Sequence, residues 1–309
     1  MGTSSMDWMI ILTFIAQTIR ISVPYTLAAV GATFSERGGV VNIALEGILL
    51  NGAFACALAT HYTGNPWLGV LAAVVGGVAT ALIHAVVTIT FKAEQIVSGL
   101  AINLFAAGAT RFFLKVIFGS SSNSGRIAGM PEWAIPVLRD IPVVSTIFSS
   151  PLILAAVVVV AASQITLFRT VFGLRLRSVG EHPEAADSLG VSVTAMRYAG
   201  VLASGALAGL GGAWLAMDQH SFTDGMSSGR GYIALAAMIV GKWNPLGAAG
   251  ACLLFGAAES LQMQLQGGNV PTQFIQMIPY VATIAVLAGF IGRSVPPAAD
   301  GVPYQKERQ

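Results

Sequence analysis

The chain has 309 residues, of which 55% are apolar and only 10% are charged, and its mean hydropathy is +0.73. Soluble domains carry about 25% charged residues, so this composition excludes a water-soluble protein and predicts one that crosses a membrane several times. The net charge of +2 and the scattered basic residues exclude a nucleic-acid-binding protein.

The two cysteines, Cys56 and Cys252, both lie inside apolar runs. This placement excludes a disulfide framework or a thiolate metal site and predicts that both thiols are buried in packing. The N-terminal stretch MGTSSMD has neither a positively charged region nor a small-residue cleavage site. We therefore expect no removable signal peptide, and the first apolar run should stay in the mature protein.

The apolar runs predict an all-α polytopic membrane protein, since roughly 20 apolar residues span the hydrocarbon core of a bilayer. The first run is unusually long and contains Arg20 and Pro24, and Tyr232–Gly241 covers only half a bilayer. That short run predicts a short or re-entrant helix, or a span completed by flanking glycines and polar residues, so we expect eight to ten crossings. The candidate spans are Trp8–Thr33, Val40–Thr60, Trp67–Phe91, Gln95–Phe118, Pro151–Phe168, Arg197–Met217, Leu246–Leu265 and Phe274–Ile291.

Lysine and arginine in the connecting segments predict the orientation, because they gather on the cytoplasmic side of membrane proteins. If residues 170–193 are cytoplasmic, ten basic residues share that side and four lie opposite. This arrangement gives one membrane domain, residues 1–293, with an external loop at 119–150, an external N-terminus and a cytoplasmic tail at 294–309 that we expect to be disordered. The ten are Arg37, Lys92, Arg169, Arg175, Arg177, Arg197, Lys242, Arg293, Lys306 and Arg308, and the four are Lys115, Arg126, Arg139 and Arg230.

Two short stretches resemble each other: GVVNIAL begins at Gly39, and GYIAL begins at Gly231. Inverted repeats are common in transporters. A match this short does not distinguish a repeat from chance.

Polar residues inside the apolar spans mark candidate functional positions, because they are costly there and usually face an interior or a water-filled path. Asn42 and Glu46 are four residues apart and share one face of a helix, with glycines on both sides that permit a break. An interrupted helix with an amide and a carboxylate on one stripe suits a translocation path. The alternative is a helix start at the cytoplasmic interface, where Glu46 pairs with Arg37.

Two further polar stripes follow. Gln95, Gly99 and Asn103 recur every four residues, and Glu259 is followed by Gln262 and Gln266 at helical spacing. These amides either line a path or form hydrogen bonds between helices. Together with the first stripe they give the candidate path residues, which are Asn42, Glu46, Gln95, Asn103 and Glu259.

Two other intramembrane features favour structural roles. His84 stands alone on an apolar face, which is more typical of a buried structural histidine than of a ligand. The run from Gly205 to Ala213 repeats small residues at a spacing that lets helices approach closely, so it predicts packing rather than binding.

The stretch Thr170–Val193 is the longest polar run between strongly apolar segments. Within it Glu184, Ala185 and Ala186 are followed by three residues and then Gly190, which reads EAAxxxG. Pro183 and Glu184 are suited to start a helix and Gly190 to end one. We expect a short helix of small residues, free of the membrane, that docks into a groove on a soluble partner.

The sequence contains no catalytic constellation. It lacks GxxxxGK[ST], HExxH and GxSxG, and its histidines, His61, His84, His182 and His220, are dispersed. We therefore expect no catalytic residue, no metal centre and no ATP hydrolysis by this chain alone.

Nearly the whole chain resembles one family, the membrane permeases of bacterial ABC importers for branched-chain amino acids, simple sugars and nucleosides. It looks most like the nucleoside and simple-sugar permeases, particularly the shorter of two paralogous permeases in nucleoside systems. The segments with this resemblance are SERGGVVNIALEGILLNGAF (35–54), AEQIVSGLAINL (93–104), FGLRLRSVGEHPEAADSLGVSV (172–193), SGALAGLGGAWL (204–215) and GRGYIALAAMIVGKWNPLGA (229–248).

The resemblance implies a fold similar to the vitamin B12 type of importer, with about ten helices per subunit and two permease subunits around the path. It implies a multi-pass protein of the bacterial inner membrane, an external substrate-binding protein, and a separate cytoplasmic ATPase that binds the ATP. The chain itself would need no cofactor. The 170–193 loop then matches the region that couples to the ATPase, through Arg175, Arg177, Glu184, Ala185, Ala186 and Gly190.

Our hypothesis is thus an ABC importer permease for a nucleoside or related small polar solute, paired with a second, paralogous permease. The rivals are a sugar or branched-chain amino acid permease, a proton-coupled transporter that uses Glu46 or Glu259, and, least favoured, a membrane enzyme. A proton-driven carrier has no need for a cytoplasmic EAAxxxG helix, so that motif favours the ABC importer.

Overall fold

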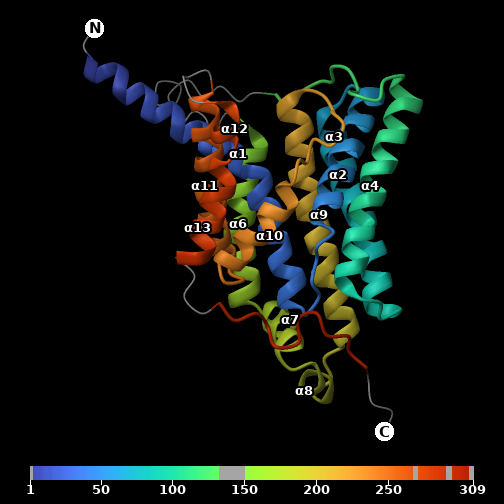
Figure 1. Ribbon diagram of the computed structural model, residues 1–309. Helices are drawn as coiled ribbons and strands as arrows, with labels where there is room; N and C mark the ends of the chain where they lie inside the picture. Colours follow the sequence, from blue (N-terminus) through green and yellow to red (C-terminus); the bar gives the residue numbers. More distant parts are fainter. Residues whose placement is uncertain (1–2, 132–149, 267–270, 290–293, 306–309) are drawn as a thin grey trace.

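The structure is a computed structural model that describes residues 3–131, 150–266, 271–289 and 294–305. Within these ranges every regular element is helical, and the only strand-like feature is a single bridge between Asn123 and Thr223. The elements are α1 (Thr3–Arg37), α2 (Leu45–Thr63), α3 (Pro66–Ala85), the π-helical turn η1 (Val86–Thr90), α4 (Gln95–Phe118), α6 (Pro151–Arg169), α7 (Val171–Glu181), α8 (Pro183–Ser188), α9 (Val193–Gln219), α10 (Arg230–Val240), α11 (Pro245–Leu265), α12 (Thr272–Gln276) and α13 (Ile278–Gly289) (Figure 1).

The helix boundaries follow from local sequence signals. The side chains of Asn65 and Asn244 accept hydrogen bonds from the first backbone N–H groups of α3 and α11, and each is followed by a proline at the first helical position. Glu94 caps α4 in the same way, and Gly119 ends it with a φ of 70°. These caps place the ends of the long helices close to where the apolar runs begin and end.

The prediction of an all-α polytopic membrane protein is confirmed. Among the described residues, six helices are long and apolar enough to cross a membrane: α1, α3 with η1, α4, α6, α9 and α11. The helices α2, α10 and α12–α13 follow the remaining predicted segments but are not among these six, so the expected eight to ten crossings stay a prediction. The run Tyr232–Gly241 covers most of the 11-residue α10 and the turn after it, so the short helix predicted from its length is present.

The overlong first span is one continuous helix in spite of Pro24. Its first turns lean away from the other helices in Figure 1, and the side chain of Trp8 is 66% exposed. From Ser22 onward the helix runs through the core, where Leu27 and Ala28 are fully buried.

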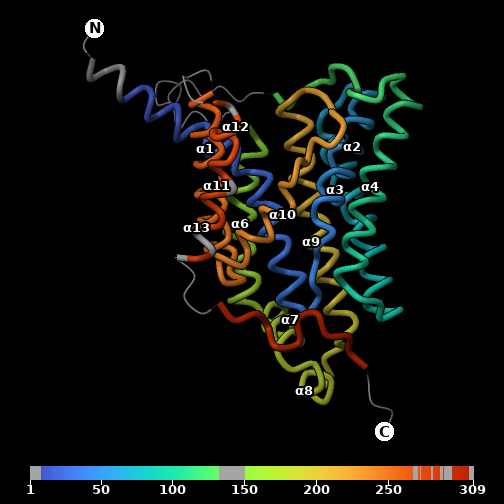
Figure 2. The backbone as a smooth tube through the Cα atoms, viewed as in Figure 1, coloured from blue at the N-terminus to red at the C-terminus, as the bar shows by residue number. Residues whose placement is uncertain are grey.

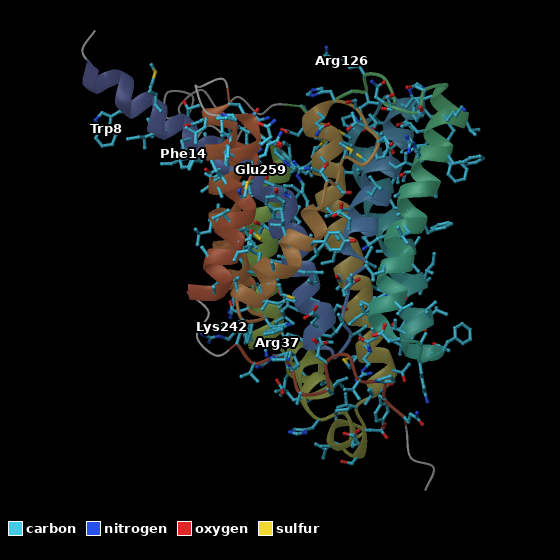
Figure 3. The ribbon with its side chains drawn as sticks, in the orientation of Figure 1. Trp8, Phe14, Arg37, Arg126, Lys242 and Glu259 are labelled. Carbon is cyan, nitrogen blue, oxygen red and sulfur yellow. The ribbon has the colours of Figure 1, made fainter. Side chains whose placement is uncertain are left out.

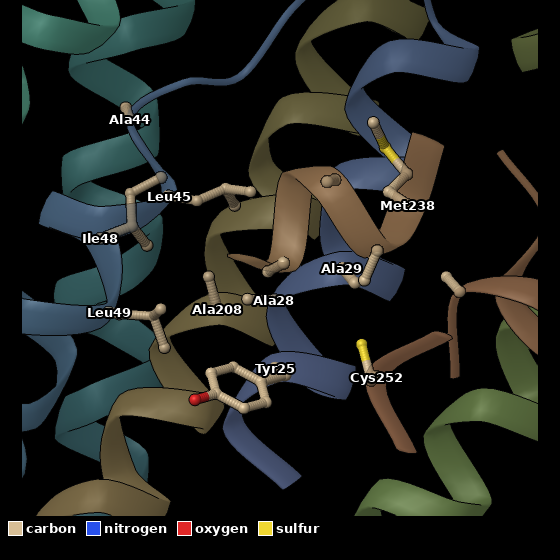
Figure 4. Packing of buried hydrophobic residues seen from close by; sticks show 14 of the residues in the cluster. Tyr25, Ala28, Ala29, Ala44, Leu45, Ile48, Leu49, Ala208, Met238 and Cys252 are labelled. Carbon is tan, nitrogen blue, oxygen red and sulfur yellow. The ribbon is translucent and has the colours of Figure 1, made fainter. Parts of the chain in front are cut away.

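Helix α9 lies at the centre of the packing and contacts α1, α2 and α3. Its glycines meet small residues on these neighbours: a Cβ on Gly209 would lie 2.4 Å from the Ala73 carbonyl oxygen, and one on Gly205 would lie 2.3 Å from the Ala81 Cβ. The small-residue run therefore serves close helix packing, as predicted. Figure 4 shows the buried cluster beside it, where Ala28 of α1 and Ala208 of α9 lie close to Leu45 and Leu49 of α2.

The helices form two groups, with α1, α6, α11 and α13 on one side, α2, α3, α4 and α9 on the other, and α10 between them (Figure 2). The two chain ends point to opposite ends of the molecule, and α7, α8 and the C-terminal segment share the lower end in Figure 1. At the other end, the described part of the predicted 119–150 loop pairs with residues 220–224, through Ser124 N–H to the Phe222 oxygen (2.9 Å) and Ile127 N–H to the His220 oxygen (2.8 Å). Residues 132–149 of that loop lie outside the described residues.

The expectation of a disordered tail was wrong for residues 294–305. This segment has no helix, but its backbone is bonded to α7 and α9, with Ala299 N–H donating to the Gly180 oxygen (2.8 Å). Contacts with residues far away in the chain hold the segment in place.

Candidate functional site

The first component of the site is the break between α1 and α2, residues 38–44. The chain turns at Gly39, whose φ is +83°, and runs without helical hydrogen bonds until α2 begins at Leu45. Backbone polar groups at membrane depth need partners inside the protein, because no water is available there. The neighbouring helices supply those partners.

Side chains of α3 and α4 satisfy this backbone. Gln95 accepts a hydrogen bond from Val41 N–H (2.7 Å), and His84 Nε2 donates to the Val41 carbonyl oxygen (3.0 Å). Asn103 donates from Nδ2 to the Ile43 oxygen (2.9 Å) and accepts at Oδ1 from Gly47 N–H (2.8 Å). The second polar stripe of the sequence therefore faces the interrupted chain, and the structural interpretation of His84 fits its buried position.

Asn42 belongs to the same cluster. Its Nδ2 donates to Ser204 Oγ of α9 (2.9 Å), and its Oδ1 has no hydrogen-bond partner among the described residues. Asn42, Gln95 and Asn103 are all buried, with exposed fractions of 0%, 2% and 8%. The structure thus brings these three predicted residues together, but it does not expose them to an open passage.

The second component is the start of α10, which Glu46 holds. One carboxylate oxygen of Glu46 accepts from Gly229 N–H and the other from Gly231 N–H, both at 2.7 Å. These are first-turn N–H groups of α10 that no helical carbonyl can satisfy. The carboxylate also lies in the first turn of α2, so it faces the positive ends of two helix dipoles. The alternative pairing of Glu46 with Arg37 is wrong, because Arg37 bonds the carbonyl oxygens of Trp243 and Lys242 instead.

The two similar stretches of the sequence meet at this point. The stretch from Gly39 covers the break and the start of α2, and the stretch from Gly231 forms the first turn of α10. A Cβ on Gly231 would lie only 2.4 Å from Glu46 N, so the two starts are in direct contact. We call residues 38–47 and 227–232 the central junction.

Glu259 reaches the opposite side of the α10 start. It forms an ion pair with Arg230 (3.2 Å), and it accepts a hydrogen bond from the hydroxyl of Tyr25 in α1. Figure 3 shows Glu259 far from Arg37 and Lys242, which lie together at the lower end. Glu46 and Glu259 therefore hold the first turn of α10 between α2 on one side and α1 and α11 on the other.

Two more ion pairs, both largely exposed, form at the end of α9 and in the segment that follows it. Asp218 pairs with Arg20 of α1 (2.6 Å), and Asp224 pairs with Arg111 of α4 (3.3 Å). Arg20, which the sequence places inside the first span, and Arg111 of α4 thus each meet a carboxylate.

The second functional region is the 170–193 loop at the lower end. The predicted short helix is confirmed as α8, which begins at Pro183 and ends at Ser188, and Gly190 follows with a φ of +80°. Ala186 is buried against Val179 and Val193. Glu184, Ala185 and Gly190 are exposed, so the EAAxxxG pattern presents these residues outward from the bundle.

Helix α7 precedes α8 and was not predicted, although the sequence contains its signals. Thr170 caps it by accepting a hydrogen bond from Gly173 N–H (3.2 Å), and Leu176 and Val179 recur at helical spacing and are fully buried. Arg175 is exposed, whereas the Arg177 guanidinium lies 4.8 Å from the ring centre of Phe168 in α6. The two arginines therefore have different surroundings: Arg175 is open to solvent and Arg177 is turned back toward the bundle.

Comparisons with known proteins agree on one family. A family model described as "Branched-chain amino acid transport system / permease component" matches residues 14–287. The chain is 45% identical to the guanosine ABC transporter permease protein NupQ of Bacillus subtilis, over 94% of this chain and 96% of that protein. It is 44% identical to the nucleoside ABC transporter permease protein NupC of Lactococcus lactis, over 95% and 97%. It is also 25% identical to NupP, a second guanosine ABC transporter permease protein of Bacillus subtilis, over 91% and 83%.

Proposed function

The chain belongs to the branched-chain amino acid transport system permease family, and we propose that it forms the translocation path of an ATP-driven importer for nucleosides, together with a second permease. It is a multi-pass membrane protein and an ABC permease subunit. We place it in the bacterial cytoplasmic membrane with α7, α8 and the C-terminal segment inside.

One observation supports a nucleoside as the cargo: over nearly its full length, the chain is 44–45% identical to two permeases named for guanosine and nucleoside transport. A nucleoside is neutral and rich in hydrogen-bonding groups, which suits a path held together by amides and paired carboxylates rather than by unpaired cations. A sugar or a branched-chain amino acid remains the alternative cargo within the same family.

The proposed ATPase partner binds at α8. This helix stands at the tip of the lower end in Figure 1. Its exposed residues include Glu184 and Ala185, and Leu189, which directly follows the helix, is 84% exposed. A large apolar side chain beside small residues and one charge is suited to insertion into a groove of a soluble protein. The partner would bind and hydrolyse ATP, since this chain has no phosphate-binding GxxxxGK[ST] loop.

We further propose that the second permease is a paralogue, and that an external binding protein delivers the solute. Bacillus subtilis has two permeases named for guanosine, NupQ and NupP, and this chain is 45% identical to one and 25% identical to the other. A heterodimer in which this chain takes the place of NupQ accounts for that difference.

The five predicted path residues are proposed to build the wall of the path. Asn42, Gln95 and Asn103 bond the interrupted backbone or a neighbouring helix, while Glu46 and Glu259 hold the start of α10. This engagement disfavours the proton-driven alternative. Each carboxylate is already occupied, Glu46 by two backbone N–H groups and Glu259 by Arg230 and Tyr25.

Uptake measurements test the proposal. Cells that express the permeases, the ATPase and the binding protein should take up labelled guanosine only when this chain is present, and labelled ribose and leucine should be unaffected. Loss of ribose or leucine uptake on deletion would change the cargo and keep the importer. Uptake that survives ATP depletion but is abolished by a protonophore would overturn the ATP-driven mechanism.

A further inference from the structure

The C-terminal segment 294–305, here called the strap, runs across the lower end of the molecule beneath the helices (Figure 1). It has no helix or strand, and side-chain and backbone hydrogen bonds hold it. Besides the bond of Ala299 to Gly180 in α7, Ser294 Oγ donates to the Ile239 oxygen of α10 (3.0 Å), Ala298 N–H to Glu181 of α7 (3.2 Å), and Arg197 of α9 to the Val302 oxygen (2.9 Å).

The strap also touches the first residues of the central junction. A Cβ on Gly39 would lie 3.1 Å from the Ala299 oxygen, and one on Gly180 would lie 2.2 Å from the Arg37 oxygen. Strap, α7 and the start of the 38–44 break are therefore in direct contact. Farther along, Tyr304 packs against the apolar cluster of Val179, Ala186 and Val193, which joins α7, α8 and α9.

Two carboxyl groups meet where the strap crosses the end of α1. Asp300 is hydrogen-bonded to Glu36, which is only 5% exposed and also accepts a hydrogen bond from the indole N–H of Trp243 (2.6 Å). Two ionised carboxylates in direct contact would repel each other. The observed hydrogen bond therefore needs one of the two groups to carry a proton. The strap is thus attached through a contact that depends on protonation.

The attachment is incompletely satisfied. Among the described residues, Asp300 Oδ1 and the Nε and Nη2 atoms of Arg197 are buried without a hydrogen-bond partner. Buried polar groups without partners destabilise the state that contains them. These unpaired groups lower the free energy needed to release the strap. Such a low cost is expected of a contact that opens and closes during each transport cycle.

We propose that the strap is a positioning element that fixes the coupling helices α7 and α8 to the end of α1 and to the 38–44 break, so that movement of α8 reaches the central junction. The proposal rests on the proposed ATPase contact at α8. It adds a path for the movement that bypasses the long spans, from α8 through Tyr304 and Ala299 to Gly39.

The strap contact should weaken as pH rises. Burial raises the pKa of Asp300 from 3.8 to about 7, although the hydrogen bond with Glu36 and the charge of Arg197 lower it. A released Asp300 would ionise near its ordinary pKa, so docking takes up a proton at neutral pH. Docking is firmest below about pH 4, weakens as pH rises, and is weakest above about pH 7. The charged or titratable groups around this contact are Glu36 and Arg37 of α1, Glu181 of α7, Glu184 of α8, Arg197 of α9 and Tyr304 of the strap.

Hydrogen–deuterium exchange of the strap tests the contact without any partner protein. In the wild-type chain, opening measured at the Ala299 amide should increase about twentyfold from pH 5.5 to pH 7.5, after division by the intrinsic exchange rate. In Asp300→Asn this increase should shrink, and in the double variant Glu36→Gln/Asp300→Asn it should vanish, because the proton is shared by these two carboxyl groups. Val295→Ala, which alters an exposed strap side chain, is the matched control and should keep the wild-type pH dependence. Equal pH dependence in Asp300→Asn and the wild type would overturn the protonation-dependent contact.

Transport per ATP tests the mechanical role in the reconstituted importer. A chain that ends at residue 293 should assemble with the ATPase but transport at least fivefold less solute per ATP hydrolysed. Wild-type transport per ATP in this truncated chain would refute the positioning role. If the truncated chain does not assemble, the variant Asp300→Lys takes its place, because it puts a second cation beside Arg197. Its transport per ATP is then judged in the same way. Failure of the proposed importer function can be distinguished from failure of the strap proposal, because in that case even the wild-type complex would show no ATP-dependent uptake.

Discussion

The central junction and the coupling end use polar residues in opposite ways. At the junction, Gln95 and Asn103 are hydrogen-bonded to the backbone of the 38–44 break and the start of α2, and Glu46 is hydrogen-bonded to the backbone at the start of α10. At the coupling end, Glu184 and Arg175 are exposed on short helices outside the bundle. The difference follows from the solvent. In the membrane an unbonded backbone group is costly, whereas in water a side chain can stay unpaired until a partner arrives.

This contrast separates two kinds of mutational effect. Substitutions at the junction should lower stability, because they leave buried backbone groups without partners. Substitutions at the coupling helix should leave stability nearly unchanged and reduce transport. Measuring both quantities on every variant therefore tests whether the two regions differ as the structure indicates.

The largest effect is expected for Glu46→Ala. It removes the acceptor of two partly buried N–H groups at the start of α10, which should cost roughly 2–5 kcal/mol of stability. Glu46→Gln keeps one carbonyl oxygen and should lose about half as much. Thermal unfolding of the purified protein in detergent measures both. An unchanged midpoint in Glu46→Ala would mean that Gly229 and Gly231 do not depend on this carboxylate.

Next in size is the effect of closing the small-residue contact between α3 and α9. In Gly209→Ala the new methyl group would lie 2.4 Å from the Ala73 oxygen, so the helices must separate, at a cost of about 1–3 kcal/mol. Gly108→Ala is the matched control, because nothing lies within 4 Å of its new methyl group. It should be neutral or stabilise the helix by up to about 1 kcal/mol. The same thermal measurement applies, and equal shifts in both variants would contradict the packing role.

Reversing the charge of the coupling helix should act on transport alone. Glu184→Lys should reduce ATP-driven uptake about tenfold, equivalent to about 1.4 kcal/mol, with the amount of protein in the membrane unchanged. Lys115→Glu reverses an exposed charge at the other end of the molecule and serves as the control. Normal uptake by Glu184→Lys would remove α8 from the proposed ATPase contact.

The smallest effect is expected for the exposed ion pair at the upper end. The side chains of Arg20 and Asp218 are 53% and 34% exposed, so their pairing should contribute less than about 1 kcal/mol. The pair of Arg230 and Glu259 is far less exposed, at 18% and 16%. Arg20→Gln should therefore unfold almost like the wild type, whereas Arg230→Gln should be clearly destabilised. Similar shifts in the two variants would show that burial does not separate these pairs.

Prediction from the sequence succeeded where the signal was local. The proline and glutamate at 183 and 184, with Gly190 beyond them, marked α8 correctly, and the short run at 232–241 marked a half-length helix. The residues of α7 had equally local signals in Thr170, Leu176 and Val179, but the charged residues among them concealed the helical pattern. The spacing of Gln95 and Asn103 identified a polar face without showing what that face contacts.

By itself, the sequence determined that the chain is an all-helical membrane protein, where most of its spans lie, and which loop carries the EAAxxxG helix, because apolar length and helix caps are read over a few neighbouring residues. Only the tertiary structure decided the partners of the polar groups. Asn42 contacts Ser204, Glu46 contacts Gly229, and Glu36 contacts Asp300. The two residues of each pair are far apart in the sequence, so no local pattern can predict the contact. The order of the strap was decided in the same way, since a short irregular segment is held only by the helices on which it lies.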